Sequence, residues 1–214
     1  MLYPLPAVMV SCQKPGEKPN IITVAWTGTI CSDPAMVYIS VRPSRYSYDI
    51  IRSTREFVIN LTDEKLARSM DLCGVKSGRD IDKFAACGLT AVPSLEVAAP
   101  SIGDSPVCIE CKVAQVIELG SHDMFLANVA AVTVDGSLID QYGKFHLDQA
   151  GLTAYSHGEY YTLGTYLGKF GYSVKKPGKG TGTGKPGQRK RNSHHHAAEG
   201  SGKRYKGNTE RRHS

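Results

Sequence analysis

Apolar and polar residues alternate over several short stretches of this chain, with the two-residue period that is typical of strands with one buried face. Between residues 20 and 26, Ile22, Val24 and Trp26 alternate with smaller or more polar neighbours. Similar runs predict further strands at residues 4–12, 36–41, 56–61, 95–97, 107–119 and 125–134. Six or more strands with few helices indicate a mainly β protein, built as an antiparallel barrel.

Three short helices are predicted between these strands. The first covers residues 48–54. The second covers residues 62–70, where Thr62 is placed to cap the helix. The third covers residues 80–87 and ends at Gly88, a residue type that favours helix termination.

The junction that follows strand 36–41 has the composition of an anion site. Ser44 or Ser47 can cap the next helix through its hydroxyl, and the free N–H groups and dipole at a helix start favour a negative charge. Arg42 and Arg45 add fixed positive charge and paired donors, so a phosphate fits this turn. The alternative is that the serine only caps and the arginines only face water. The residues alone leave both interpretations open.

A set of short motifs follows one order over about residues 1–174. They lie at residues 20–26, 32–34, 42–47, 56–61, 77–84, 120–123 and 156–161. Together they resemble the flavin reductase-like family of FMN-binding split barrels, and its flavoredoxin branch in particular. Each motif is weak alone, but the ordered set is specific. The resemblance implies a mainly β, FMN-binding split β-barrel with a few short helices that assembles as a two-fold dimer.

The resemblance also implies non-covalently bound FMN. The cofactor-binding residues that it indicates are Ala25, Trp26, Thr27, Val41, Arg42, Ser44, Arg45, Ser47 and Lys83. The strand end around Trp26 would supply N–H donors and a flat apolar wall for the ring. Lys83 would reach the phosphate as a point charge. The alternatives are that Trp26 is an ordinary core residue and that Lys83 is a solvated surface lysine.

The segment 156–161 combines polar and aromatic residues, and aromatic rings there could cover a flat ligand. In the resembled family this part of the chain lies close to the flavin. His157 is therefore the candidate catalytic residue beside the flavin or nicotinamide, with a structural hydrogen bond as the alternative. His122 is interpreted as a loop histidine paired with its neighbour. The resemblance implies NADH or NADPH as the electron donor.

Charge is divided unevenly along the chain. Residues 175–214 hold 12 Lys and Arg against 2 Asp and Glu, whereas residues 1–174 hold 14 against 18. We therefore divide the chain into a mildly acidic domain, 1–174, and a basic Gly/Lys-rich tail, 175–214, that is expected to be disordered. Because Tyr205 is the tail's one aromatic residue, weak non-specific binding is the most that we expect between the tail and nucleic acid.

The cysteines suggest an intracellular setting. They occupy positions 12, 31, 73, 87, 108 and 111. Most lie in apolar runs, and neither a secretory signal nor an apolar run of membrane-spanning length is present, so reduced thiols, a cytoplasmic location and no membrane contact are expected. Cys108 and Cys111 form a lone Cys-x-x-Cys on a predicted strand, where their side chains face opposite ways, so no metal site is expected.

Three functions remain open on this basis. The favoured one is an NAD(P)H-dependent flavin reductase or flavoredoxin-like electron-transfer protein, working as a homodimer and with an electron-acceptor protein as a further candidate partner. The second is an FMN-binding electron carrier or binding module without NAD(P)H activity of its own. The third places the function in the basic tail. No Gly-x-Gly-x-x-Gly or P-loop motif occurs in the domain, so a nicotinamide cofactor would bind without a Rossmann fold.

Overall fold

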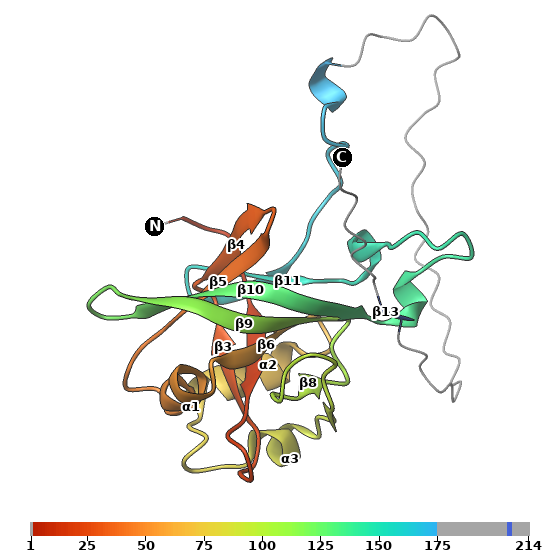
Figure 1. Cartoon of the computed structure of the whole chain (residues 1–214). Helices are drawn as coiled ribbons and strands as arrows, with labels where there is room; N and C mark the ends of the chain where they lie inside the picture. The colour runs from red at the N-terminus through yellow and green to blue at the C-terminus, as the bar shows by residue number, and fades with distance from the viewer. Residues whose placement is uncertain (1, 175–204, 207–214) are drawn as a thin grey trace, which may run out of the picture. The chain divides into compact units, whose positions relative to one another are not determined.

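The computed structural model describes residues 2–174 and the strand at 205–206 (Figure 1). Its main sheet is antiparallel at every pairing. The strands run in the order β3 (Asn20–Val24), β2 (Val8–Cys12), β6 (Glu56–Leu61), β9 (Val107–Glu118), β10 (Asp123–Val134), β5 (Ala35–Val41) and β4 (Thr27–Ser32), with β13 (Tyr205–Lys206) paired to β10. Two smaller sheets consist of β1 (Leu5–Pro6), β11 (Thr153–Ser156) and β12 (Glu159–Thr162), and of β7 (Ala91–Val92) and β8 (Ser101–Ile102).

Two residues connect the opposite edges of the main sheet. Ala25 and Trp26 lead directly from β3, at one edge, into β4, at the other. The N–H of Ser40 in β5 donates a 2.8 Å hydrogen bond to the Trp26 carbonyl, which holds the end of β3 against β5. The sheet therefore curls back on itself as a split barrel, and the expected mainly β split-barrel fold is confirmed.

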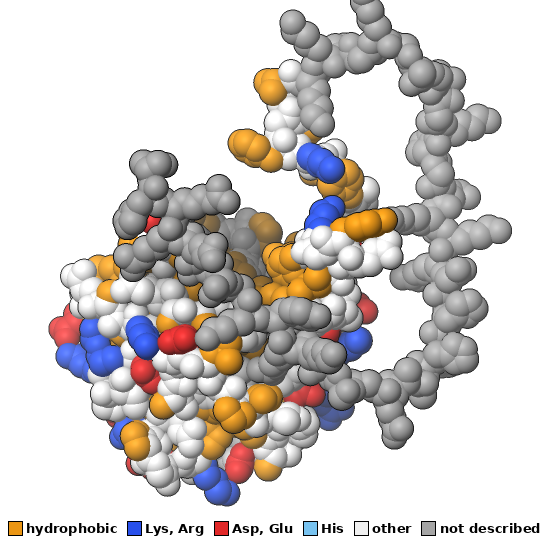
Figure 2. Space-filling view, turned by 45° about the vertical axis from the view of Figure 1, so that its right-hand side comes forward, with side chains coloured by type: hydrophobic (Ala, Val, Ile, Leu, Met, Phe, Trp, Pro, Cys, Tyr) orange, Lys and Arg blue, Asp and Glu red, His pale blue; other side chains and the backbone are white. Residues whose placement is uncertain are grey.

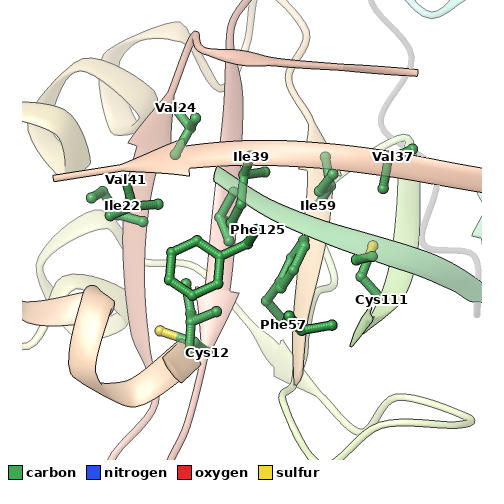
Figure 3. Close-up of a cluster of buried hydrophobic side chains, with 14 of the residues drawn as sticks. Cys12, Ile22, Val24, Val37, Ile39, Val41, Phe57, Ile59, Cys111 and Phe125 are labelled. Atoms are coloured by element: carbon green, nitrogen blue, oxygen red, sulfur yellow. The ribbon is translucent and has the colours of Figure 1, made fainter. Parts of the chain in front are cut away.

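The interior of the curled sheet is filled by side chains from six of its strands and from helix α1 (Tyr46–Thr54). Phe57 and Phe125 are fully buried there and point into the same interior as Ile39 and Cys12 (Figure 3). Cys111 belongs to this cluster, whereas Cys108 belongs to a separate cluster on the other face of the sheet. The two cysteines of the Cys-x-x-Cys motif therefore face opposite ways, as predicted.

A second layer covers the outer face of β2 and β3. Helices α2 (Ala67–Val75) and α3 (Lys83–Cys87) bury Met70 and Phe84 against Met9 and Ile21. The backbone comes close at Gly74, where an added Cβ would lie 3.2 Å from Thr23 Cβ. This layer fixes the end of α2 beside the point at which β3 leaves the sheet.

The helices begin at other residues than the sequence predicts. The N-cap of α1 is Arg45, which makes no side-chain capping bond, so the prediction that Ser44 or Ser47 caps this helix is wrong. Thr62 does not cap α2, because it is buried and its hydroxyl donates to the Ala7 carbonyl at 2.5 Å.

The third helix is shorter than predicted. It begins at Lys83, because the carboxylate of Asp82 caps it by accepting from Ala85 N at 3.1 Å. Its end at Gly88 is confirmed, since Gly88 adopts the left-handed conformation with φ 64°.

Some strand predictions also need correction. Residues 27–32 lie outside the predicted strands but form strand β4, which pairs with β5 through a register shift between Thr29 and Cys31. No strand forms at residues 95–97; the pair β7 and β8 lies on either side of that segment. The backbone N–H groups of Leu95 and Glu96 bond instead to the buried carboxylate of Glu110.

Within the described residues, no helix is long and apolar enough to cross a membrane. The face of the molecule in Figure 2 carries Lys and Arg side chains next to Asp and Glu, without a field of one sign. Residues 164–174 form a separate segment with one 3-10 turn at Tyr172–Val174. The predicted tail, 175–214, lies outside the described residues apart from β13, so its disorder stays a prediction.

Candidate functional site

A cavity of about 330 Å³ opens where β3 ends and the chain crosses to β4. Its walls come from β3, β5, α2, the β9–β10 turn and the β11–β12 sheet. The lining residues are Ala7, Ile22, Thr23, Val24, Ala25, Trp26, Ser40, Val41, Arg42, Arg45, Asp71, Gly74, Val75, His122, Tyr155 and Tyr160. We call it the ring cavity, because its lining is largely apolar and aromatic.

A smaller cavity of about 160 Å³ adjoins it at the start of α1. The residues that line it are Asn20, Ile22, Ser44, Arg45, Tyr46, Ser47, Cys73, Gly74, Lys76, Ser77, Gly78, Arg79 and Lys83. Ile22, Arg45 and Gly74 line both cavities. We call the smaller one the phosphate cavity, because it gathers cationic side chains and hydroxyls. A flat ring that carries an anionic tail matches this pair of adjoining spaces.

Two parallel rings stand in the wall of the ring cavity. Trp26 and His122 have their planes within 1° of each other and their centroids 6.1 Å apart. Trp26 is 42% exposed, so it is not an ordinary core residue. The pKa of His122 is held below its usual value by burial and then by the charges of Arg42 and Arg45. His122 is therefore neutral at pH 7, and can accept or donate a hydrogen bond as an uncharged ring.

The ring cavity is also lined by a tyrosine that is held in place by a hydrogen bond. Tyr160 in β12 donates a 3.1 Å hydrogen bond to Asp71 in α2. Burial, followed by the bond to Asp71, raises the pKa of Tyr160 to about 12, so its phenol stays protonated at neutral pH. The tilted ring of Tyr155 packs against it at 5.8 Å between centroids. These contacts join the sheet of β1, β11 and β12 to α2 at the cavity lining.

The turn before α1 directs basic side chains to both cavities. The N–H of Arg45 bonds to the Arg42 carbonyl at 3.0 Å, and the Arg45 carbonyl accepts from Tyr48 N at the first turn of α1. This tight turn places Arg45 at the boundary of the two cavities. A guanidinium there can form paired charge-assisted bonds with a phosphate.

Lys83 is a buried cation in the wall of the phosphate cavity. Lys83 is only 3% exposed, and its Nζ donates to the carbonyls of Ile21 at 2.6 Å and Cys73 at 2.7 Å. Burial lowers its pKa. An ammonium has three donors, so one remains for an anion. The alternative of a solvated surface lysine is therefore wrong.

The loop after α2 closes the phosphate cavity by a close backbone approach. A Cβ added to Gly78 would lie 2.1 Å from Asn20 Oδ1 and 2.7 Å from Tyr46 Cδ1, so no larger residue fits without displacement. Arg79 follows, with its guanidinium carbon 5.4 Å from the Tyr46 ring centroid and Nη1 donating to the Ser44 carbonyl at 3.4 Å.

The structure brings together most of the residues that the sequence indicates. Those lining the two cavities are Ala25, Trp26, Val41, Arg42, Ser44, Arg45, Ser47 and Lys83. Thr27 lines neither cavity: it is buried, and its hydroxyl donates to the Tyr38 carbonyl at 2.7 Å. His157 also lines neither; it lies in the β11–β12 turn with φ 52°, and its ring packs edge-on against Tyr3.

Sequence reasoning missed three participants. His122 is a loop histidine that pairs with its neighbour, as interpreted, because its Nδ1 lies 2.9 Å from Ser121 Oγ; what the sequence did not indicate is that it also lines the ring cavity. Asn20 and Gly78 shape the phosphate cavity, although neither has a charge that draws attention to it. All three lie inside the motifs at residues 20–26, 77–84 and 120–123, so the motifs themselves contained the signal.

Comparison with known proteins identifies the family. A family model described as the flavin reductase like domain matches residues 1–164. The chain belongs to this family. Membership makes this flavin reductase-like chain a flavoprotein of the oxidoreductase type, and it agrees with the shape and charge of the two cavities.

Individual relatives point in the same direction. The solved flavoredoxin of Desulfovibrio vulgaris (Miyazaki F) is 33% identical, with a TM-score of 0.76, and the match covers 82% of this chain and 95% of that one. An uncharacterized protein of Pyrococcus abyssi is 32% identical over 133 residues, 62% of this chain and 76% of its own length. A protein of Moorella thermoacetica named high molecular weight rubredoxin is 30% identical over 148 residues, 65% of this chain and 61% of its own length.

Proposed function

We propose that this chain binds FMN non-covalently and transfers electrons from NADH or NADPH to an acceptor, as a flavin reductase or a flavoredoxin-like protein. The observation that carries the proposal is the joining of the two cavities at Arg45, with parallel rings in one and buried or fixed cations in the other. FMN, when bound, supplies the redox chemistry, and the protein supplies binding, orientation and electrostatics.

In this proposal the phosphate end is bound by Arg45, Lys83 and Ser47. Arg45 and Lys83 neutralise the phosphate charge, and the Ser47 hydroxyl donates to one of its oxygens. All three line the phosphate cavity. A site with this much positive charge favours FMN over riboflavin, which lacks the phosphate.

The ring end is positioned by the strand end and by the ring cavity. Ala25, Trp26, Val41 and Arg42 all line the ring cavity. Trp26 supplies a flat apolar surface, and exposed backbone at the end of β3 supplies donors for a ring with several acceptor atoms. We retain Thr27 as a positioning residue, because its hydrogen bond to the Tyr38 carbonyl fixes the turn into β4.

A nicotinamide needs an open surface beside the flavin position. Two histidines are candidates for that surface. His122 lines the ring cavity and is neutral, so it can stack against a flat ring without adding charge. His157 has the weaker geometric case in a single chain, but its exposed β11–β12 turn is available to a second copy of the chain. We propose a homodimer on the basis of the family resemblance, with an electron-acceptor protein as a further partner.

The alternative is an FMN-binding electron carrier without NAD(P)H activity of its own. The similarity to a flavoredoxin and to a protein named as a rubredoxin favours a role in electron transfer without specifying the donor. Reduction by a protein partner would then replace reduction by a nucleotide.

The deciding experiment uses the purified full chain. Flavin absorbance in the protein, or its gain on titration with FMN, tests the binding proposal. Anaerobic addition of NADH and then of NADPH tests the donor, because bleaching of the flavin band reports reduction. A protein that takes up no flavin would overturn the proposal. A protein that binds FMN but is reduced by neither nucleotide would leave the carrier as the function.

A further inference from the structure

Two cysteine thiols meet beside the phosphate cavity. Cys73 Sγ in α2 and Cys87 Sγ in α3 are 3.9 Å apart, and both thiols are free. A disulfide has an S–S bond of about 2.05 Å, so the two sulfurs need to approach by roughly 1.9 Å to form one. The cysteines lie in separate short helices joined by a loop, and a small rigid-body movement of one helix can supply that approach.

The two thiols differ in access. Cys73 is 1% exposed and packs in the cluster under α2 and α3, whereas Cys87 is partly exposed. Burial raises the pKa of Cys73 to about 12, so Cys73 remains a thiol at neutral pH. A dissolved oxidant therefore meets Cys87 first, and Cys73 is placed behind it as the resolving thiol.

A fixed cation accompanies the pair. Lys83 is the first residue of α3, and its Nζ donates to the carbonyl of Cys73 itself at 2.7 Å. The ammonium is close to both sulfurs. Negative charge on Cys73 or Cys87 would raise the pKa of Lys83 and so oppose the lowering caused by burial.

The same residues form the wall of the phosphate cavity. Cys73, Gly74 and Lys76 belong to the end of α2 and the residue after it, and Lys83 faces them from α3. Drawing Cys73 toward Cys87 would shift the carbonyl that holds Lys83 and the backbone at Gly74, which lines both cavities. The state of the thiols is thus connected to the shape and charge of the phosphate cavity by direct contacts.

We propose that Cys73 and Cys87 form a reversible disulfide in response to peroxide, and that this disulfide weakens the binding of phosphate-bearing flavin. The oxidant is hydrogen peroxide, which arises wherever reduced flavin meets oxygen. The disulfide itself does not depend on the function proposed above; its effect on flavin does.

The chemistry balances in two steps. The Cys87 thiolate attacks one oxygen of hydrogen peroxide, which breaks the O–O bond, forms Cys87–SOH and releases hydroxide that takes up a proton as water. The Cys73 sulfur then attacks the Cys87 sulfur, the S–S bond forms, and the Cys73 proton leaves with the sulfenic hydroxyl as a second water. Two thiols lose two electrons and two protons, and one peroxide becomes two waters. A dithiol reductant reverses the bond by exchange.

The first test is chemical and needs no flavin. The reduced full chain is treated with hydrogen peroxide, and intact mass and non-reducing peptide mapping are recorded. We expect loss of two hydrogen atoms and a linked peptide that contains Cys73 and Cys87, both reversed by dithiothreitol. Cys87→Ser and Cys87→Ala should each abolish the link. Cys31→Ser, which alters a partly exposed cysteine in β4, should retain it. Absence of this link in the wild type, or an equal loss of two hydrogen atoms in the Cys87 variants, would overturn the proposal.

The second test measures FMN affinity of the reduced and the oxidised chain by fluorescence titration. Several-fold weaker binding after oxidation, restored by dithiothreitol and absent in Cys87→Ser, is the expected result. If the mass data show the link but the two forms bind FMN equally, the proposed effect of the disulfide on flavin binding is overturned and the proposed function stays intact. Binding to neither form would overturn the proposed function and the effect on affinity together, while the mass data would still decide the disulfide.

Discussion

Asn20 Nδ2 donates a 2.7 Å hydrogen bond to Ser47 Oγ, and so connects the first residue of β3 to the first turn of α1. Both residues are buried, at 4% and 1% exposure. Since Ser47 accepts this bond through its oxygen, its own proton is left to donate to another group. The hydroxyl that the sequence suggested as a helix cap therefore serves the floor of the phosphate cavity, and the anion site depends on contacts between elements far apart in sequence.

Removing the guanidinium of Arg45 should weaken the binding of FMN much more than the binding of riboflavin. A charge-assisted bond to phosphate is worth about 1.5 to 3 kcal/mol, so Arg45→Ala should lower FMN affinity by roughly 10- to 150-fold. Riboflavin has no phosphate, and its affinity should hardly change. Fluorescence titration with both ligands measures the two effects.

The matched control for this experiment is Arg68→Ala. Arg68 is an exposed arginine in α2 that lines neither cavity, so its loss changes the net charge equally and leaves the site intact. Equal losses of affinity for FMN and riboflavin in Arg45→Ala would mean that Arg45 contacts the flavin ring or supports the fold, and does not bind the phosphate.

Adding one methyl group at Gly78 should disturb the phosphate cavity. The new Cβ would lie 2.1 Å from Asn20 Oδ1, and so would displace the side chain that holds Ser47. Overpacking of this kind costs about 1 to 3 kcal/mol, and we expect Gly78→Ala to lower both the thermal midpoint and the FMN affinity. Gly164→Ala is the control, because an added Cβ there meets no atom within 4 Å. Unchanged FMN affinity in Gly78→Ala would remove this loop from the site.

The sequence was informative wherever one residue type in one local pattern decides the structure. The alternation in β3 and β5 and the terminator Gly88 depend on neighbours in the chain, and they were predicted. The motifs also indicated Arg45, Ser47 and the family, because a resemblance carries three-dimensional information that spacing alone does not.

The rest depends on contacts between distant segments. Thr62 fits a capping pattern, but a bond to the Ala7 carbonyl across the fold competes for its hydroxyl. The proximity of His122 to Trp26 follows from the pairing of β9, β10 and β5, which no local pattern fixes. The burial of Lys83 likewise needs two carbonyls from different elements.

The homodimer remains a prediction, and sedimentation can test it. A split barrel leaves part of its flavin site for a second copy in the resembled family, and most soluble oligomers have two-fold symmetry. The full chain should sediment as a dimer at micromolar concentration, with or without FMN. Sedimentation as a monomer under both conditions would count against the dimer and against any role of His157 that needs a second copy.

His122 should make stability depend on pH in a defined direction. Its pKa is lowered in the folded chain, so the unfolded chain takes up the proton more readily. Stability linked to His122 is therefore complete above its ordinary pKa of about 6.5 and is lost as the pH falls below it. In His122→Gln this dependence should disappear, so the free energy of unfolding of the variant should rise relative to that of the wild type as the pH drops. Denaturant unfolding without flavin, at several pH values, measures the difference; parallel curves would contradict the burial of the ring.

Reduction by NAD(P)H should separate the two histidines. His122 stands in the ring cavity beside Trp26, and a nicotinamide must lie against the flavin in that region to transfer electrons. We expect His122→Ala to slow NAD(P)H-dependent reduction by roughly 10- to 100-fold while FMN affinity hardly changes, because misplacing a reactant by about an ångström has effects of that size. His157→Ala should have the smaller effect. Anaerobic stopped-flow absorbance on the FMN-loaded proteins gives the rates.

Dithionite provides the control for that experiment, since it reduces flavin without a nucleotide pocket, and its rate should be the same in wild type and both variants. A slow dithionite reaction in a variant would point to a changed flavin environment instead of a lost nicotinamide contact. If His157→Ala alone is slow with NAD(P)H, His157 and not His122 contacts the nicotinamide. The β11–β12 turn must then reach a flavin site, and the dimer would have to provide that site. If neither variant is slow, neither histidine takes part in nucleotide reduction. Tyr160 is then the next side chain of the ring cavity to replace, and Tyr160→Phe would remove the hydroxyl that bonds to Asp71.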